Sequence, residues 1–378
     1  FRKANGATTN EMVLDVKHPE ILQLEKTGNK YVMGAAQKGK PMVFSDTLEL
    51  DLPEKVLAGI FMSSHQKGVT ETALFSNLRV TVPAPMDYTP YEDYSGSRLE
   101  IMDVKTHRRK VIYTTEEAIE APNWSRDGKH LIYNSQGKLY KIPAEGGTPE
   151  QINTGFAESL NNDHGISRDG SMIAISHHDE SVQDRPGSRI YVLPYEGGTP
   201  RAVTAKTPSY WHGWSPDDQF LVYTAMRNGA YNIYKIPTDG GKEIQLTDHP
   251  MLDDGPEYSA YGTYIYINSA RTHTMQIWRM KPDGDDLEQL TFDRYNDWFP
   301  HISPQNDQIA FLSYPPEIDA EAHPHYKHVM LRCIKPSAQG NPRVLTYLYG
   351  GQGTINVPSW NPQGTKVAFV SYSFPGGD

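Results

Sequence analysis

A nine-residue motif recurs six times between residues 125 and 369. Most copies begin with Ser, continue through a short run of Pro, Asp, Asn or Gly, and end in a hydrophobic run such as Leu-Ile-Tyr. The copies begin at Ser125, Ser167, Ser215, Ser259, Ser303 and Asn361, so successive starts are 42, 48, 44, 44 and 58 residues apart. A recurring period of this length indicates repeated copies of one supersecondary unit.

Each copy predicts a strand, a tight turn and a second strand. Pro presets φ and Gly or Asn accepts positive φ in such turns, and β-branched and aromatic residues then favour the next strand. A second motif, a hydrophobic and aromatic run ending in Pro, follows four copies at residues 139–143, 190–194, 233–237 and 277–282. It predicts a third strand, a Gly turn and a fourth strand. Four strands in about 44 residues are typical of one β-propeller blade.

The two ends of the repeat predict how the ring closes. Residues 99–104 and 111–113 resemble third and fourth strands without a preceding motif, whereas the motif at residues 361–369 has no such strands after it. The two halves complement each other. We therefore expect an all-β, six-bladed propeller over residues 97–378, closed by strands from residues 97–115, with no exposed sheet edge.

These motifs resemble the repeat of the TolB-like β-propeller family, whose signature is Ser-Pro-Asp-Gly followed by a hydrophobic strand. The resemblance covers residues 97–378. The family includes the protein-binding propeller of TolB, propellers fused to peptidases, and oligogalacturonate lyases, so it implies the fold and leaves the function open. The peptidase branch is excluded because the chain has no Gly-x-Ser-x-Gly motif and no α/β region after the propeller.

Residues 1–84 predict a separate segment. Short strands are expected at residues 21–26, 30–33, 48–52, 56–62 and 73–80. The last of these resemble the final strands of a concanavalin-like or laminin-G-like jelly roll, a module that accompanies many extracellular carbohydrate-active proteins. Because a jelly roll needs about eight strands, an incomplete one is expected. Residues 85–96 are rich in Pro and predict a semi-rigid linker.

Composition narrows the partners. Lys and Arg number 36 and Asp and Glu 46, for a net charge of −10, and no basic face that would grip nucleic acid is visible. No apolar run is long enough for a membrane helix. The single cysteine, Cys333, cannot form an intrachain disulfide. The family resemblance implies a bacterial periplasmic or extracellular protein, although no signal-peptide pattern is present in this chain.

The five residues before each motif end the innermost strand of a blade, so they are expected around the mouth of the central channel. Their first positions are polar or aromatic throughout, which suits a ligand-binding funnel. The expected ligand-binding residues are Glu120, Asn162, Tyr210, Trp211, Asp254, Trp298 and Asn356.

Histidines at the same strand ends suggest chemistry. His164 and His212 share one register in neighbouring blades, and His301 is one place later in another. With Asp163 and Asp254 they could hold one divalent metal ion, Ca, Mn or Zn, or supply a general base. The alternative is that each is a packing histidine bonded to the backbone. The candidate catalytic residues are His212, His164 and His301, and the candidate metal ligands are His164, His212, His301, Asp163 and Asp254.

The 58-residue interval contains a second candidate, residues 314–328 with His323 and His325, because function concentrates on insertions. A solvated loop is the alternative. A shorter insertion, residues 177–187, is a weaker candidate for a functional site. The Gly-rich residues 350–354 lie between strands and open no helix, so a phosphate loop is not expected.

Two function classes remain open. The favoured one is a carbohydrate-directed propeller that binds an oligo- or polysaccharide at the channel mouth, with a metal-assisted polysaccharide lyase as its catalytic version. A lyase needs a base and a cation beside a uronate carboxylate, which His212 with His164 or His301 could provide. The absence of Arg or Lys at the funnel positions counts against a uronate. The alternative is a non-catalytic propeller of the cell envelope that binds another protein.

Overall fold

The structure, a computed structural model, describes residues 6, 8, 10–53, 56, 59–60, 62–64, 66–85, 87–89, 92–180, 187–337 and 341–374. The chain divides into two compact units, Phe1–Leu78 and Arg79–Asp378. All regular secondary structure in the described ranges is β-strand, and no helix that could span a membrane occurs there.

The first unit contains one small antiparallel sheet. Its strands are β1 (Ile21–Thr27), β2 (Lys30–Ala36), β3 (Val43–Phe44) and β4 (Leu48–Glu49). Both β1 and β3 pair with β2, and β4 pairs with the start of β2. The expected strands near residues 21, 30 and 48 are therefore present, the last one only in part.

The strand expected at residues 73–80 is wrong. This segment forms no strand, and Leu74 and Leu78 are 95% and 71% exposed. A strand needs a partner for its backbone N–H and C=O groups, and residues 73–80 belong to none of the described sheets. The expected strand at 56–62 lies partly outside the described residues. The jelly roll stays a prediction.

In the second unit, five four-stranded antiparallel sheets follow the repeat in order. Sheet 1 contains β7 (Glu120–Trp124), β8 (His130–Ser135), β9 (Lys138–Pro143) and β10 (Glu150–Gln151). Sheet 2 contains β11 (Leu160–Ile166), β12 (Met172–Asp179), β13 (Gly187–Pro194) and β14 (Arg201–Ala202). Sheet 3 contains β15 (Ser209–Trp214), β16 (Phe220–Arg227), β17 (Ala230–Pro237) and β18 (Ile244–Gln245).

Sheet 4 contains β19 (Asp253–Tyr258), β20 (Ile265–Ser269), β21 (Gln276–Met280) and β22 (Glu288–Gln289). Sheet 5 contains β23 (Asn296–Ile302), β24 (Ile309–Tyr314), β25 (Lys327–Ile334) and β26 (Arg343–Gly350). Sheet 6 joins the two ends of the unit in the order β27 (Lys366–Ser373), β5 (Gly96–Asp103) and β6 (Arg109–Thr115).

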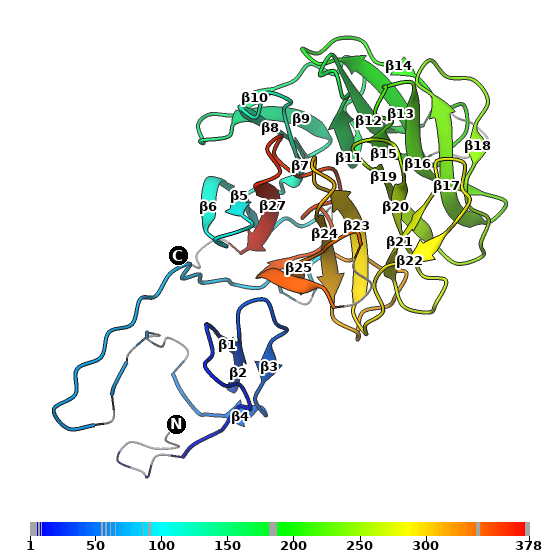
Figure 1. Cartoon of the computed structure of the whole chain (residues 1–378). Helices are drawn as coiled ribbons and strands as arrows, with labels where there is room; N and C mark the ends of the chain where they lie inside the picture. The colour runs from blue at the N-terminus through cyan, green and yellow to red at the C-terminus, as the bar shows by residue number, and fades with distance from the viewer. Residues whose placement is uncertain are drawn as a thin grey trace. The chain divides into compact units, whose positions relative to one another are not determined.

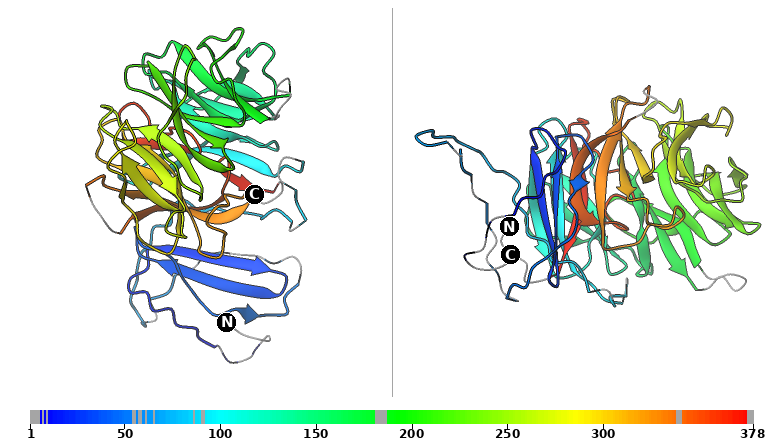
Figure 2. Two further views of the ribbon diagram at one scale, coloured as in Figure 1. Left: turned by 90° about the vertical axis from the view of Figure 1, so that its right-hand side faces the viewer. Right: turned by 90° about the horizontal axis from the view of Figure 1, so that it is seen from below.

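The sheets stand side by side around a ring (Figure 1 and Figure 2). The innermost strands β7, β11, β15, β19 and β23 contact one another in this order, and β27 contacts both β26 and β7. Apolar side chains of the second strands, such as Leu131, Ile173 and Ile265, are fully buried between sheets. The TolB-like propeller fold expected from the repeat is therefore present.

The ring is closed by long-range pairing. β27 pairs with β5 over eight residue pairs, from Lys366↔Asp103 to Ser373↔Gly96, and Trp360 adds a bridge to Val367 as the innermost residue of sheet 6. The sequence predicted closure of the ring by these same two segments, the unmatched strands at residues 97–115 and the last copy of the motif.

A buried carboxylate ties the closing strands together. Glu100 of β5 is fully buried and accepts hydrogen bonds from Arg109 of β6, Ser371 of β27 and Arg79. Burial alone would raise the pKa of Glu100, but Arg109 outweighs that effect and lowers it. Arg109 also donates to Thr346 and to the Tyr347 carbonyl of sheet 5, so one ion pair joins three strands of sheet 6 to its neighbour.

Replacing Glu100 with Gln should destabilise the propeller by about 3–5 kcal/mol, because a buried Arg109 charge would lose its partner. Denaturant unfolding at neutral pH measures this loss. Because the folded pKa of Glu100 is lowered, its contribution is present above the unfolded pKa and disappears as pH falls through the folded pKa, so the difference between variant and wild type should shrink in acid.

The matched control is Glu145→Gln, which breaks the exposed Lys110–Glu145 pair of 2.7 Å. Exposed pairs contribute little, so the melting temperature should stay near that of the wild type. Equal stability of all three proteins would contradict the role given to Glu100.

Candidate functional site

Each innermost strand starts at the same end of the ring, which we call the mouth. Five of these strands, β7, β11, β15, β19 and β23, have an irregular register with the next strand in the same place, shortly after the strand begins. A bulge re-aims the following side chains. At this place Ala121, Gly255 and Phe299 have φ near +55 to +61°. Positive φ is costly for Phe and Ala. In the sequence, Gly255 occupies the position equivalent to Ala121 and Phe299, and a glycine there could have indicated this backbone conformation.

Four of the predicted residues converge at the mouth. His212 Nε2 lies 3.1 Å from Asp254 Oδ1, and that oxygen also accepts hydrogen bonds from Thr224 and the Gly255 amide. Asp163 lies close enough to His212, Asp254 and Glu120 for all three to influence its pKa. We call Glu120, Asp163, His212 and Asp254 the mouth cluster. Each comes from a different sheet, and all four are buried.

The two aspartates of the mouth cluster have opposite titration behaviour. Burial raises the pKa of Asp163 to about 7, although the charge of His212 works against this. Burial would also raise the pKa of Asp254, but its hydrogen bond to His212 outweighs this and lowers it to about 2. Burial lowers the pKa of His212, yet the charges of Asp163 and Asp254 outweigh it and raise that pKa. Groups with such divided pKa values concentrate at functional sites.

Several other predicted residues do not belong to the mouth cluster. His301 bonds to Glu257 at 2.6 Å and to the Ile355 carbonyl, so its ring is directed at these two groups and not at the mouth cluster. His164 is buried, burial lowers its pKa to about 4, and neither ring nitrogen has a well-formed hydrogen bond. Trp211 is 1% exposed in the core against Gly165. Trp298 is buried but touches His323 edge to face at 4.5 Å. Asn162 and Asn356 are buried.

The metal expected from the histidines stays a prediction. In the ranges that the structure describes, no group of three or more His, Cys, Asp or Glu side chains has an arrangement that could hold a metal ion. Asp254 Oδ1 already takes hydrogen bonds from three partners.

Residues 315–326, which we call the mouth insertion, lie at the mouth because they join β24 to β25 there. Within it, Ile318 accepts a hydrogen bond from Asn296, and Glu321 accepts one from the Leu252 amide. His325 bonds to Glu120 at 2.9 Å. The insertion therefore touches the strand starts of sheets 1, 4 and 5. His325 bonds to Glu120 of the mouth cluster, and His323 lies close enough to Asp254 to influence its pKa. Whether the two histidines bind an ion stays a prediction.

The Gly-rich segment 351–356, which we call the plug, fills the axis of the ring at the mouth. The Ala121 amide of sheet 1 donates to the Gly353 carbonyl at 2.6 Å. His301 of sheet 5 bonds to the Ile355 carbonyl, and the Asn356 backbone influences the pKa of His212 of sheet 3. A segment that contacts sheets 1, 3 and 5 from inside must lie between them. A Cβ at Gly353 would meet the Tyr372 hydroxyl at 2.4 Å, so close packing explains this glycine.

The insertion and the plug leave a partly exposed rim. Tyr210 and Tyr231 are partly exposed, with ring centroids 6.3 Å apart, and the side chain of Tyr210 lies near Asp163 and Asp254. His323 and Gln352 are partly exposed as well. Tyr231 and Gln352 were not predicted, because one lies on the third strand of its sheet and the other in a turn.

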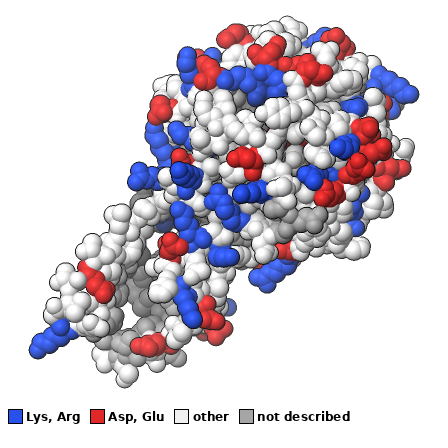
Figure 3. All heavy atoms as spheres, in the orientation of Figure 1, with Lys and Arg blue, Asp and Glu red and all other residues white. Residues whose placement is uncertain are grey.

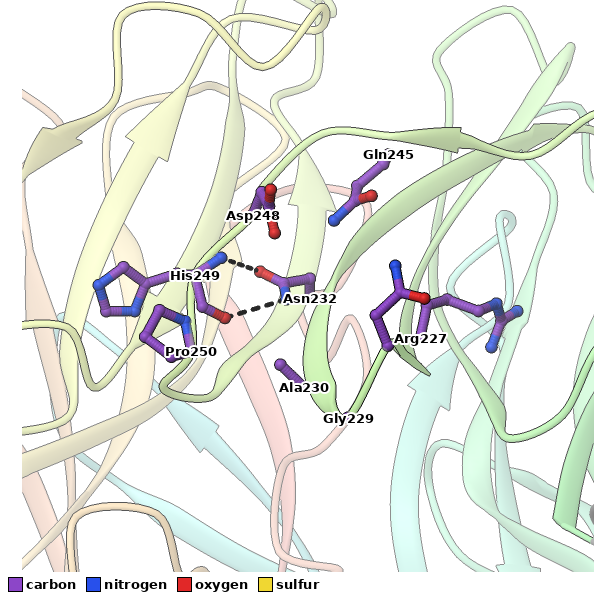
Figure 4. Close-up of a pocket in the computed structure, with 9 residues that line it drawn as sticks. Arg227, Gly229, Ala230, Asn232, Gln245, Asp248, His249 and Pro250 are labelled. Carbon is purple, nitrogen blue, oxygen red and sulfur yellow. Dashed lines mark hydrogen bonds between the residues drawn. The ribbon is translucent and has the colours of Figure 1, made fainter.

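A separate shallow hollow lies on the mouth face, between the β16–β17 turn and the connection to β19 (Figure 4). Two of its polar groups already pair: the Asn232 side chain donates to the His249 carbonyl at 3.1 Å and accepts from the His249 amide at 2.8 Å. Arg227 is paired with Glu243. The mouth cluster is the better candidate site.

Asp163→Asn should change the pH dependence of stability. Because the folded pKa of Asp163 is raised, ionising it as pH rises from about 4 toward 7 costs folding free energy. The variant lacks this cost. We expect the wild type to lose on the order of 2 kcal/mol relative to the variant between pH 5 and pH 8, as measured by urea unfolding. Parallel curves would contradict the raised pKa, and Asp169→Asn, at an exposed turn, serves as the control.

Comparison with known proteins agrees with this architecture. The family model described as the TolB beta propeller domain matches residues 209–317. "Uncharacterized protein Atu1656" of Agrobacterium fabrum is 46% identical over 280 residues, which are 74% of this chain and 93% of that protein. A solved structure from Agrobacterium tumefaciens, described as a TolB candidate, is 45% identical with a TM-score of 0.70, covering 75% of this chain and 99% of that one.

The Tol-Pal system protein TolB of Francisella tularensis is 25% identical over 236 residues, 59% of this chain and 52% of that protein. The match thus spans about half of that relative's length. The repeat, the ring of sheets and the relative that is 46% identical all lead to one assignment. The chain belongs to the TolB-like β-propeller family.

Proposed function

We propose that this propeller is a carbohydrate-directed protein of the bacterial periplasm or exterior that binds a saccharide at the channel mouth. The observation that carries the proposal is the partly exposed Tyr210–Tyr231 pair beside Asp163 and Asp254. Tyr rings present an apolar face with a polar tip, which suits a sugar ring. Carboxylates accept hydrogen bonds from hydroxyl groups.

Charge favours one class of saccharide. The mouth cluster contributes three carboxylates, Glu120, Asp163 and Asp254, and among the described residues their ion-pair partners are His212 and His325. A uronate would meet like charge there. We therefore expect a neutral or amino-bearing sugar to bind better than an acidic one.

Lys and Arg are interspersed with Asp and Glu over the visible face of the second unit (Figure 3).

Tyr210→Ala should weaken saccharide binding at least tenfold, about 1.4 kcal/mol, because the rim loses one of its two rings. A glycan array first identifies the saccharide, and calorimetric titration then measures its dissociation constant. Tyr261→Ala is the control, since Tyr261 is 77% exposed in the turn of sheet 4 at the other end of the ring. Equal loss in both variants, or no glycan bound, would contradict the proposal.

The catalytic version is a lyase in which His212 acts as base. Its test is the ultraviolet absorbance of an unsaturated uronate product over acidic polysaccharides, with His212→Ala as comparison. The divalent metal of that version predicts a bound ion in elemental analysis and a lower melting temperature after chelation. No bound ion together with unchanged melting would contradict the metal-assisted reaction and leave the binding function unaffected.

The second candidate function is docking of an envelope protein, which the match to a Tol-Pal system protein favours. The two functions separate experimentally. If the chain captures a protein from a periplasmic extract, and Tyr210→Ala captures it equally well while no glycan binds, the protein-binding function stands in place of the saccharide one.

A further inference from the structure

The turn motif departs from the family signature in its first two copies. Its second residue is Arg126 in sheet 1 and Arg168 in sheet 2, whereas the remaining copies have Pro216, Ala260, Pro304 and Pro362. The function proposed for the mouth does not use these arginines.

Both arginines lie at the end of the ring opposite the mouth. The innermost strands β7 and β11 run from the mouth into these turns, which hydrogen bonds from Ser125 to Asp127 and from Ser167 to Asp169, each 2.7 Å, hold in shape. The fold therefore places Arg126 and Arg168 at equivalent positions of neighbouring sheets.

Their side chains reach inward, toward other sheets. Arg126 Nε donates to the Ser167 carbonyl at 2.8 Å, and its Nη2 donates to the Ile166 carbonyl. Arg168 Nη2 donates to the Tyr258 carbonyl of sheet 4 at 3.3 Å. Since sheet 3 lies between sheets 2 and 4 in the ring, the Arg168 side chain passes along the inner side of sheet 3 toward the axis.

Neither guanidinium is neutralised directly. In the described part of the chain, no carboxylate lies within 4.0 Å of either one. The acids nearby have other partners: Asp218 accepts the amides of Arg168 and Asp169 at 2.7 and 2.9 Å, and Glu257 pairs with His301. Asp169 itself bonds to Ser167 and Ser171.

Solvent reaches both arginines, since Arg126 is exposed and Arg168 is partly exposed. Arg126 is exposed, yet desolvation, followed by the charge of Arg168, lowers its pKa to about 10. In the described residues no hydrogen bond uses Nη1 of Arg126, or Nε and Nη1 of Arg168, so donors remain for a ligand.

We propose that Arg126 and Arg168 form a second binding site, at the end of the channel opposite the mouth, for an oxyanion of the carboxylate or phosphate class. Guanidinium groups bind such groups through paired charge-assisted hydrogen bonds. The three nearby carboxylates, Asp218, Glu257 and Asp169, reduce the net positive charge around the two arginines, but they are directed at their own partners. The site thus recognises an anionic group by its geometry, and it is independent of the saccharide proposed at the mouth.

The test is calorimetric titration of the full chain with inorganic phosphate and, separately, with citrate, at constant ionic strength. We expect saturable binding of at least one of the two probes, and the stronger one identifies which oxyanion the site prefers. Arg126→Gln and Arg168→Gln should each weaken that binding roughly tenfold or more, because each removes a charged donor pair.

Arg201→Gln is the matched control, because it removes an exposed arginine that is paired with Asp239 at 3.3 Å and changes the net charge equally. It should bind the probe like the wild type. Absence of saturable binding by either probe, or equal weakening in Arg201→Gln, would overturn the site. Thermal unfolding of each variant without ligand shows whether it folds. A Gln variant that does not fold is replaced by the Lys variant at the same position, Arg126→Lys or Arg168→Lys. The Lys variants keep the charge and should still bind the probe more weakly than the wild type.

Discussion

The pairing of β27 with β5 is the constraint on which the rest of the molecule depends. A channel, a mouth and an opposite end exist only when the sheets form a closed ring, and eight residue pairs between the last strand and the first close it. Glu100 strengthens this seam because its buried carboxylate is shared by Arg109 and Ser371 on both neighbouring strands. Every site residue described here takes its direction from that closure.

The two ends of the ring differ chemically. At the mouth, the plug and the mouth insertion cover the axis, and the carboxylates of Glu120, Asp163 and Asp254 dominate. At the opposite end, Arg126 reaches the neighbouring sheet 2 and Arg168 reaches sheet 4, and among the described residues neither has a carboxylate partner in ion-pair range. Because the plug lies between them, the ends can hold different ligands. Six similar repeats have in this way acquired two unlike surfaces.

Much of the fold could be predicted because it rests on local periodicity. The turn motif and the hydrophobic runs recur in every repeat, so each of the five complete sheets could be anticipated, and the unmatched strands at residues 97–115 indicated the seam. The sequence alone could not decide whether residues 73–80 form a strand, since a strand exists only where another segment pairs with it. Leu74 and Leu78 have the expected pattern but remain exposed.

The site was predicted in part for a similar reason. Their position at the strand ends predicted that four residues would lie together, and they do converge: Glu120, Asp163, His212 and Asp254. His301 lies one register position later and bonds to Glu257 instead, and Trp211 turns into the core. The plug could not be predicted, because its position depends on contacts with three separate sheets. Asp163 acquires its raised pKa from the same long-range arrangement.

The pairing of β27 with β5 also determines when the ring can be completed during synthesis of the chain. β5 and β6 are made before any complete sheet of the ring, whereas β27 is its last strand, so the 250 residues between Thr115 and Lys366 must be synthesised between the two halves of one sheet. Until then β5 and β6 lack their partner, and the edge of the growing array is open to other chains. Such distant pairing is slow. The same contact that completes the ring thus leaves its nascent form dependent on protection from aggregation.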